Sequence, residues 1–285
     1  MKEAPFWTDD YPRPTDLDVG QLPAATDVLV IGGGITGLTA ARRLARAGLD
    51  TTVVDTNRLG DGASAINGGM AVYGLKAEAK AVIGRFGDRL GRELWEAANT
   101  AIDRIEQVIG EESIACDFSR PGSAEFGFND RDSRNLAAYA RWTTETLGFP
   151  IDFVPRDQLG EVVGSERFSM ALTDNISAGL HPAKYTFGLA EAAARAGATL
   201  VEQAEVTAVN RTGGGFAATT SKGVLQAGRI LVATNGYTGK LFRAIRRGIV
   251  PIGSYSIVTE QLPADLAEEL LPGNRMAWTA RRFLN

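Results

Sequence analysis

Residues 27–55, DVLVIGGGITGLTAARRLARAGLDTTVVD, carry the pattern of a strand, a glycine-rich turn, a helix and a second strand. The apolar run 28–31 predicts a buried strand, and the turn after it contains a complete G-x-G-x-x-G at 32–37. Apolar residues then recur at helical spacing through 38–45, and residues 51–54, TTVV, predict a second buried strand. This order of elements predicts a βαβ unit with the glycine turn between its first strand and its helix.

The residue types in this stretch fit the binding of a dinucleotide. Gly32 permits the tight turn, Gly34 lets the backbone approach a pyrophosphate, and Gly37 lets the helix pack closely on the sheet. The pyrophosphate would meet unpaired N–H groups and the positive end of the helix dipole. Asp55 follows the second strand, where a carboxylate can hydrogen-bond a ribose hydroxyl and would repel a 2′-phosphate. The alternative is a glycine-rich turn in another kind of α/β protein.

The composition is that of an ordinary globular protein. Of the 285 residues, 44% are hydrophobic and 22% are charged, enough for one large domain or two ordinary ones. The net charge of −4 does not indicate a surface that binds nucleic acid. No apolar run is long enough to span a bilayer. The single cysteine, Cys116, excludes an internal disulfide and is expected to be a buried thiol in a reducing compartment. Because the N-terminus lacks the pattern of a signal peptide, we expect a cytoplasmic protein.

Metal and hydrolase chemistry have little support in the sequence. His181 is the only histidine, so a Ser-His-Asp triad would have to be built around that ring, and no G-x-S-x-G accompanies it. One histidine and one cysteine do not make a zinc site of the usual N/S type, and no metal site is expected. A bound dinucleotide is therefore the expected source of the chemistry.

A second glycine-rich stretch, 58–70, follows the βαβ unit directly. Its small residues build little core, but its backbone can lie against a flat polar ligand. Ser64 and Asn67 offer side-chain hydrogen bonds, and Gly68 and Gly69 permit very close approach. A simple nicotinamide dehydrogenase does not need such a loop, whereas a flavin ring has to be covered from one side. The alternative is a flexible surface loop.

Mixed helices and strands are expected along the rest of the chain. Residues 77–112 have a helical apolar stripe, either as two short helices or as one helix broken near Gly91. The other elements expected before residue 180 are strands at 113–118, 123–128 and 153–155, a helix at 131–147 and a short helix at 156–160.

The last third of the chain is expected to return to the nucleotide-binding sheet. The predicted elements are a helix at 185–196, a strand at 199–202, a meander of strands at 205–209, 216–220 and 224–227, and a separate buried strand at 229–233. The last of these strands ends in a small polar turn, Thr234 to Gly236, where a Rossmann-like domain completes its ligand pocket.

Four stretches in this order resemble the D-amino-acid oxidase (DAO) family of FAD-dependent oxidoreductases. They are VIGGGITGLTAARRLARAG (30–48) with Asp55, GASAINGG (62–69), HPAKYTFGLAEAAARAGATLVEQAEV (181–206), and RILVATNGYTG (229–239) followed by VPIGSYSIVTEQL (250–262). The chain is most similar to the γ-glutamylputrescine oxidase-like and glycine/sarcosine oxidase-like amine oxidases of that family. The resemblance covers nearly the whole chain, and the combination is specific although each motif alone is not.

The resemblance implies an α/β fold in which two domains are interleaved. One is a Rossmann-like FAD-binding domain, a βαβ unit with an inserted three-stranded meander, and the other is an α+β substrate domain built on an antiparallel sheet. The expected boundaries are an N-terminal arm at 1–25, the FAD-binding domain at 26–84 and 172–240, and the substrate domain at 85–171 and 241–285. Trp7 and Tyr11 are expected to tie the arm to the domain surface.

The resemblance also implies which residues hold FAD. Gly32, Gly34 and Gly37 would hold the pyrophosphate and Asp55 the adenosine ribose. Ser64, Asn67, Gly68 and Gly69 would face the pyrophosphate and the isoalloxazine. Val206 would touch the adenine through its backbone, with Thr234 and Gly236 nearby, and the expected cofactor-binding set also includes Ile35, Thr36 and Thr56.

Two departures from the family pattern bear on these expectations. The loop contains no histidine that could link the flavin covalently, so noncovalent FAD is expected. The chain ends at 282–285 in what looks like the start of a strand, whereas the family's chains continue and complete the substrate sheet; an open sheet edge would remain. Two alternatives therefore stay open: a truncated chain that is inactive alone or needs a complementary chain or oligomer, and a nonredox dinucleotide-binding scaffold.

The reaction that the resemblance implies is the oxidation of a C–N bond in an amine or amino acid. A hydride would pass from the carbon bearing a neutral amine to flavin N5, water would hydrolyse the imine, and oxygen would reoxidise the flavin to give hydrogen peroxide. No protein acid or base is obligatory. His181 and Tyr255 are weak candidates, because a histidine at a helix start and a core tyrosine are the more ordinary interpretations. Arg246 and Arg247 leave room for a substrate carboxylate, and the sequence does not identify the amine.

Overall fold

The computed structural model describes residues 2–17 and 19–280, and the chain divides into two compact units. The first unit comprises Met1–Gly68, Glu112–Cys116 and His181–Val258. The second unit comprises Gly69–Glu111, Asp117–Leu180 and Thr259–Asn285. The chain therefore leaves the first unit within the second glycine-rich stretch, returns to it briefly at Glu112–Cys116, and returns again at His181.

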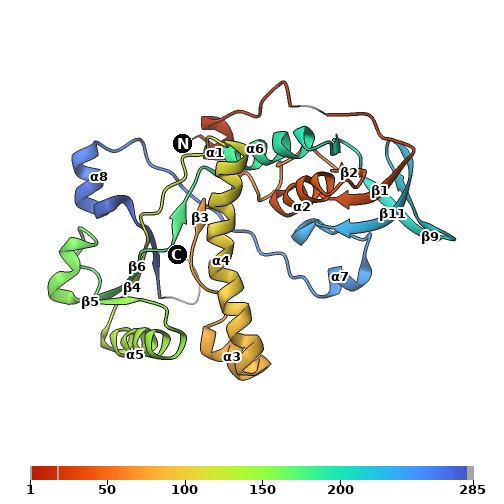
Figure 1. The fold of residues 1–285 in the computed structure, drawn as a ribbon. Helices are drawn as coiled ribbons and strands as arrows, with labels where there is room; N and C mark the ends of the chain where they lie inside the picture. Colours follow the sequence, from red (N-terminus) through yellow and green to blue (C-terminus); the bar gives the residue numbers. More distant parts are fainter. Residues whose placement is uncertain (1, 18, 281–285) are drawn as a thin grey trace. The chain divides into compact units, whose positions relative to one another are not determined.

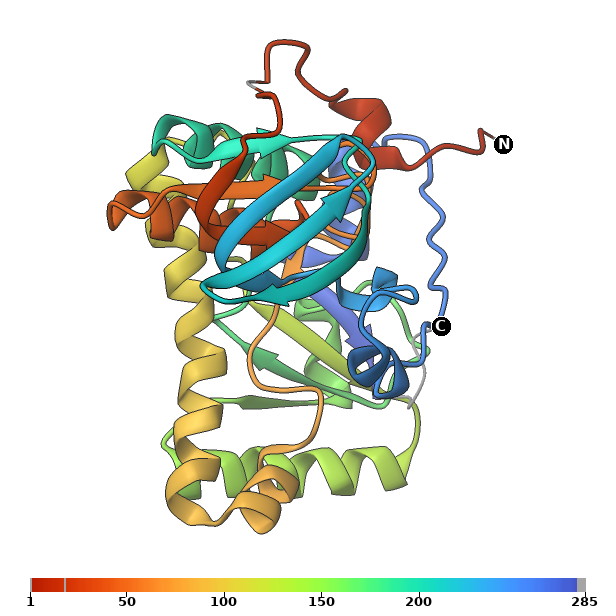
Figure 2. The ribbon, with the colours of Figure 1, turned by 90° about the vertical axis from the view of Figure 1, so that its right-hand side faces the viewer.

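A six-stranded sheet forms the centre of the first unit (Figure 1). Its order is β8 (Thr199–Val201), β2 (Thr51–Val54), β1 (Ala25–Ile31), β11 (Gly223–Val232), β10 (Gly215–Thr220) and β9 (Val206–Thr212). The first four strands are parallel, and β11, β10 and β9 form an antiparallel meander whose strands lie next to one another in Figure 2. The helices of this unit are α1 (Phe6–Asp10), α2 (Ile35–Arg46), α6 (Pro182–Arg195), α7 (Arg243–Arg247) and the short η2 (Asn235–Tyr237).

Strand β2 is buried along its whole length, and β1 is buried from Val28 to Ile31, so both of their faces are covered. Leu29 and Ile31 of β1 pack in one cluster with Ala218 and Leu225 of the meander. On the other face, Val30 lies beneath α2, and α2 in turn packs beside α6 (Figure 1). The βαβ unit predicted from the sequence is confirmed.

Strand β11 corrects the prediction of two separate strands at 224–227 and 229–233. Residues 223–227 pair antiparallel with β10 along one edge, while Gln226 to Val232 pair parallel with β1 along the other edge. Gly228 lets the backbone of β1 come close, because a Cβ there would lie 3.0 Å from the Asp27 carbonyl oxygen. One long strand therefore serves both as the last strand of the meander and as the return to the parallel sheet.

The second unit has its own four-stranded sheet, with the order β12 (Met276–Thr279), β4 (Ser123–Gly127), β6 (Met170–Asp174) and β5 (Asp152–Pro155). A two-stranded sheet pairs β3 (Met70–Ala71) with β7 (Ala178–Gly179). The helices are α3 (Ala79–Phe86), α4 (Asp88–Glu112), α5 (Asp130–Leu147), α8 (Ala264–Leu270), and the 3-10 turns η1 (Arg156–Glu161) and η3 (Pro272–Asn274). No helix in the described part of the chain combines the length and apolarity needed to cross a bilayer.

Several predicted elements need correction. The helical stretch breaks at Gly87, whose φ is +82°, and not at Gly91, which lies buried inside α4. The strand predicted at 113–118 is absent from this described segment, since Ser113 and Asp117 both have positive φ. The sequence patterns do not predict β3, β6, β7, β12, α1, α7 or α8. The expected strand start at 282–285 lies outside the described residues.

A half-buried carboxyl, Glu125, stands in β4 among aromatic side chains. Burial raises the pKa of Glu125, and the hydrogen bond with Trp278 opposes the rise. Tyr73 lies nearby, with ring centroids 6.2 Å from Trp278 and 5.1 Å from Phe149. Burial, followed by the charge of Glu125, raises the pKa of Tyr73. The ionised form of Glu125 therefore destabilises the folded protein locally.

We expect Gly37→Ala to lower the free energy of unfolding by about 1–3 kcal/mol, because its Cβ would lie 1.9 Å from the Gly32 carbonyl oxygen. The matched control is Gly110→Ala in α4, where no atom lies within 4 Å of the added Cβ. That control gains helix propensity and should change stability by no more than about +1 kcal/mol. Urea denaturation of both variants measures the contrast, and equal effects would contradict the close helix–strand contact.

Glu125→Gln should stabilise the chain relative to the natural protein as the pH rises from 4 to 8. The folded-state pKa of Glu125 lies above its unfolded value, so the natural chain is favoured below the unfolded pKa and loses that advantage as pH rises through the folded pKa. The measurement is the difference in thermal midpoint across this range, with the exposed Glu96→Gln in α4 as control. A difference that does not depend on pH would refute the assignment.

Candidate functional site

The segments that follow four parallel strands meet at one edge of the first unit's sheet. The amide of Gly32, after β1, donates to the Val54 carbonyl of β2 at 2.8 Å. Ala233, after β11, donates to Ile31 of β1 at 2.8 Å, and Asp55, after β2, donates to Val201 of β8 at 3.0 Å. The carboxyl ends of parallel strands are where open α/β sheets bind ligands.

The glycine turn has the backbone geometry that its sequence predicts. Gly32 has φ of +110°, and a Cβ there would lie 2.6 Å from the Ala233 carbonyl oxygen. A Cβ at Gly37 would overlap the Gly32 carbonyl, so α2 begins directly against the turn. At Gly34 a Cβ would lie 2.6 Å from Ser64 Oγ. The glycines therefore bring the turn, α2 and the second glycine-rich stretch into contact.

The N-terminus of α2 keeps backbone donors available. The amides of Gly34, Thr36 and Gly37 have no hydrogen-bond partner among residues 2–17 and 19–280. The neighbouring amide of Ile35 donates to Ser64 Oγ at 3.1 Å. Unpaired amides at the positive end of a helix dipole are the groups that hold a phosphate. The residues present thus fit a pyrophosphate.

Asp55 is held at this edge by two backbone amides. Its Oδ2 accepts from Gly33 at 2.7 Å, and its Oδ1 accepts from Asn57 at 2.9 Å. A carboxylate has about four acceptor positions, so two bonds leave room for a ribose hydroxyl. Thr56 is exposed beside it. Asp55 therefore also orders the glycine turn, a role that the sequence analysis did not predict.

The second glycine-rich stretch is packed on the first unit. Leu59 is fully buried against Gly33, and Ala65 is buried with Phe187 of α6. The Ser64 carbonyl accepts from Thr186 Oγ1 at 3.1 Å and from Asn67 Nδ2 at 2.8 Å. These contacts disfavour the alternative of a flexible surface loop.

The remaining predicted cofactor residues belong to several segments of the two units. Val206 is buried at the start of β9, Thr234 Oγ1 lies 2.7 Å from Thr238 Oγ1, and Gly236 is exposed. Gly68 is the last residue of this segment of the first unit. Gly69 begins the second unit and accepts a hydrogen bond from the Leu180 amide at 2.9 Å.

Two further residues, Glu202 and Tyr237, contact the second glycine-rich stretch and were not predicted from the sequence. Glu202, after β8, accepts from the Leu59 amide at 2.8 Å and pairs with Arg13. Its position directly after a strand was the available signal, the same one that drew attention to Asp55. Tyr237 is 69% exposed, and its ring lies against Gly62, where a Cβ would be 3.3 Å from Tyr237 Cε2.

The two weak catalytic candidates differ in burial. His181 is buried as the N-cap of α6, where Nδ1 accepts from the Lys184 amide at 3.3 Å and Nε2 lies 3.2 Å from Asp10 Oδ2. Tyr255 is 95% exposed in a stretch without regular structure. Arg246 and Arg247 are exposed on α7, and Cys116 is buried as expected.

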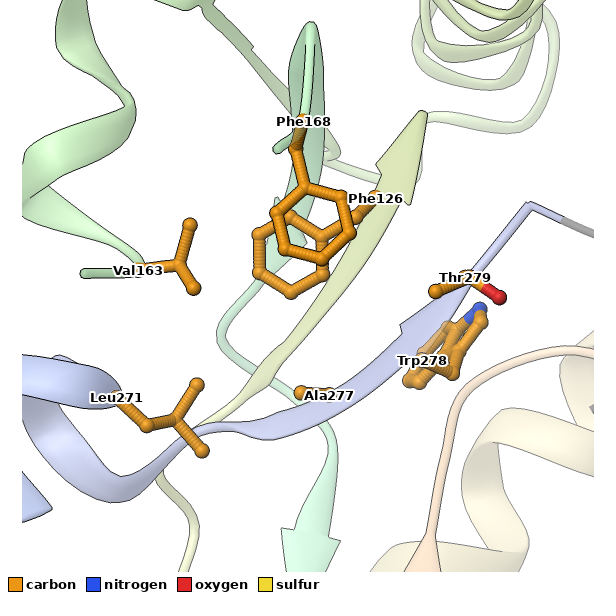
Figure 3. A pocket seen from close by; sticks show the side chains of 7 residues that line it. All are labelled: Phe126, Val163, Phe168, Leu271, Ala277, Trp278 and Thr279. Carbon is orange, nitrogen blue, oxygen red and sulfur yellow. The ribbon is translucent and has the colours of Figure 1, made fainter. Parts of the chain in front are cut away.

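The second unit has a separate apolar pocket of about 250 Å³ (Figure 3). Figure 3 shows the stacked rings of Phe126 and Phe168, with centroids 4.5 Å apart, between Val163 and strand β12. Leu271, Ala277, Trp278 and Thr279 complete the lining, and none of the residues nominated from the sequence contributes to it.

Residues 27–282 match the model of the DAO family, described as FAD dependent oxidoreductase. Over 251 residues the chain is 34% identical to the probable oxidoreductase OrdL of Rhizobium meliloti, covering 87% of this chain and 57% of that protein. It is 31% identical to the gamma-glutamylputrescine oxidoreductase of Escherichia coli, covering 87% of this chain and 58% of that protein. The chain thus spans less than two thirds of the length of these relatives.

The fold is similar to that of glycine oxidase from Geobacillus kaustophilus, with a TM-score of 0.65 at 20% identity. That match covers 80% of this chain and 60% of the glycine oxidase chain. The predicted fold class is confirmed, and FAD is the cofactor of the matching family. The chain belongs to the DAO family of FAD dependent oxidoreductases.

Proposed function

We propose that this chain binds FAD noncovalently in its first unit and takes part in the oxidation of a C–N bond in an amine or amino acid. The observation that carries the proposal is the group of unpaired amides of Gly34, Thr36 and Gly37 at the start of α2, with Asp55 at the next strand end. Two matching proteins are named for this class of substrate, a glycine oxidase and a gamma-glutamylputrescine oxidoreductase.

In this proposal each predicted cofactor residue has a defined part. The α2 amides hold the pyrophosphate, and Asp55 accepts from the ribose while keeping the glycine turn closed. Ser64 and Asn67 belong to the loop that lies along the pyrophosphate and ring, and its residues 58–69 include neither histidine nor cysteine for a covalent link. Thr234, Gly236 and Val206 border the same edge. The predicted boundaries, 26–84 with 172–240 for FAD and 85–171 with 241–285 for substrate, remain part of the proposal.

When bound, FAD supplies a ring that accepts a hydride from the carbon bearing a neutral amine. The chain's residues orient this ring and limit its exposure to water, and water hydrolyses the resulting imine. Oxygen as the final acceptor and hydrogen peroxide as its product belong to the proposal. We assign no acid or base: His181 caps a helix through Nδ1, and Tyr255 is almost fully exposed.

We expect the purified chain to show a flavin band in its visible spectrum after incubation with FAD. Under anaerobic conditions one member of a panel of amines and amino acids should bleach that band, because hydride transfer reduces the ring. A retained band that no amine bleaches would favour a chain that needs a complementary chain or oligomer. A folded chain that retains no flavin would refute the FAD site in this chain.

Asp55→Asn should weaken FAD binding about 10- to 100-fold, because a hydrogen bond to a charged acceptor contributes about 1.5–3 kcal/mol. Titration of the apo-protein with FAD, followed by flavin fluorescence, measures the change. Asp50→Asn is the matched control, since Asp50 is exposed and precedes the amino end of the same strand, β2. Equal affinities for the two variants would remove Asp55 from the site.

A further inference from the structure

The N-terminal arm contacts one end of the second glycine-rich stretch directly and is linked to the other end through Glu202. Near one end, the indole Nε1 of Trp7 in α1 donates to the Asn67 carbonyl at 2.7 Å. Near the other end, Arg13 pairs with Glu202, whose Oε1 accepts from the Leu59 amide at 2.8 Å. These are two independent contacts, made by side chains six residues apart in the arm.

The arm is itself fixed to the first turn of α6. The Trp7 and His181 rings meet edge to face with centroids 4.7 Å apart, and Asp10 Oδ2 lies 3.2 Å from His181 Nε2. The Tyr11 ring lies 5.7 Å from Lys184 Nζ and packs against the cluster that buries Ala65. Because α6 is anchored beside α2, the arm has a rigid support.

A continuous series of contacts leads from the arm to the amides proposed to hold the pyrophosphate. The Asn67 side chain donates to the Ser64 carbonyl at 2.8 Å, and Thr186 of α6 donates to the same carbonyl at 3.1 Å. The Ser64 hydroxyl then accepts from the Ile35 amide in the first turn of α2. At the other end of the loop, Leu59 packs on Gly33 of the glycine turn.

We propose that the N-terminal arm is a positioning element of the FAD site, in which Trp7 and Arg13 hold loop 59–67 in its cofactor-binding conformation. The inference rests on the proposed FAD site and adds a function for residues outside the βαβ unit and its loops. A loop ordered before binding loses less conformational freedom when the cofactor arrives, so the arm raises the affinity for FAD without touching it. Trp7 and Arg13 are positioning residues in this scheme.

The test compares Trp7→Phe, Arg13→Gln and the double variant with the natural chain. Trp7→Phe keeps an aromatic ring and removes the donor to Asn67, and Arg13→Gln removes the charge that pairs with Glu202. The matched control applies the same two substitutions to adjacent residues of α5 in the second unit, Arg141→Gln and Trp142→Phe. Each full-length apo-protein is titrated with FAD, well below its own thermal midpoint.

Each single arm variant should bind FAD about three- to tenfold more weakly, as expected for the loss of one hydrogen bond, and the double variant more weakly than either. The control should stay within about twofold of the natural chain. The vibronic structure of the bound flavin's visible band should broaden in the arm variants, and amides 59–67 of the apo-protein should exchange hydrogen faster. A contribution to stability alone would lower the thermal midpoint and leave both the affinity and the band unchanged.

The outcomes separate this inference from the proposed function. If the natural chain binds FAD and the arm variants bind it equally well with the same spectrum, the arm does not position the site and the inference is overturned. If the natural chain itself binds no FAD, the proposed function fails and the inference falls with it. Weaker binding by the arm variants, with normal binding by the α5 control, supports both.

Discussion

The close approach of α2 to the end of β1 is the constraint on which the first unit depends. A Cβ at Gly37 would lie 1.9 Å from the Gly32 carbonyl oxygen, so hydrogen is the only side chain that this distance admits. The contact starts α2 directly against the turn and keeps Gly34, Thr36 and Gly37 at its amino end with unpaired amides. If α2 lay farther from the turn at Gly32, these N–H donors would be spread apart. A helix N-terminus binds an anion because such donors are grouped there.

Carboxylates at neighbouring strand ends organise the loops around that helix start. Asp55 accepts from the Gly33 amide, and Glu202 accepts from the Leu59 amide. Hydrogen bonds to charged acceptors are stronger than neutral ones, so each acid orders a backbone segment that has few apolar side chains. The acids at the two strand ends thereby hold these glycine-rich segments in a conformation that the glycine-rich sequence alone does not specify. The second unit contributes its own sheet, in which Glu125 shows the opposite case, a carboxyl whose ionisation is opposed by burial.

The sequence predicts the βαβ unit, the meander and the helices α2, α5 and α6 well, because strong apolar periodicity and glycine signals mark them. It fails where a short strand depends on partners far away in the chain, as in β12, which pairs with β4 about 150 residues earlier. The donors of Gly34 and the acid Asp55 were recognisable from spacing. The attachment of Trp7 to the domain surface was also predicted, but its partner Asn67 was not. Arg13 and its pairing with Glu202 were missed, because that contact joins segments that local patterns do not relate.

The pairing of β1 with β11 has a consequence for how the chain folds. Val28 lies opposite Arg229, so the central pair of the parallel sheet joins residues about 200 positions apart. During synthesis the apolar strand β1 has β2 on one edge and nothing to fill the other until residue 232 has been made. The long insertion between them can acquire its own helices and sheet in the meantime. The nascent protein therefore carries an unpaired strand edge while about 200 further residues are made, a period in which chaperones would protect it from aggregation.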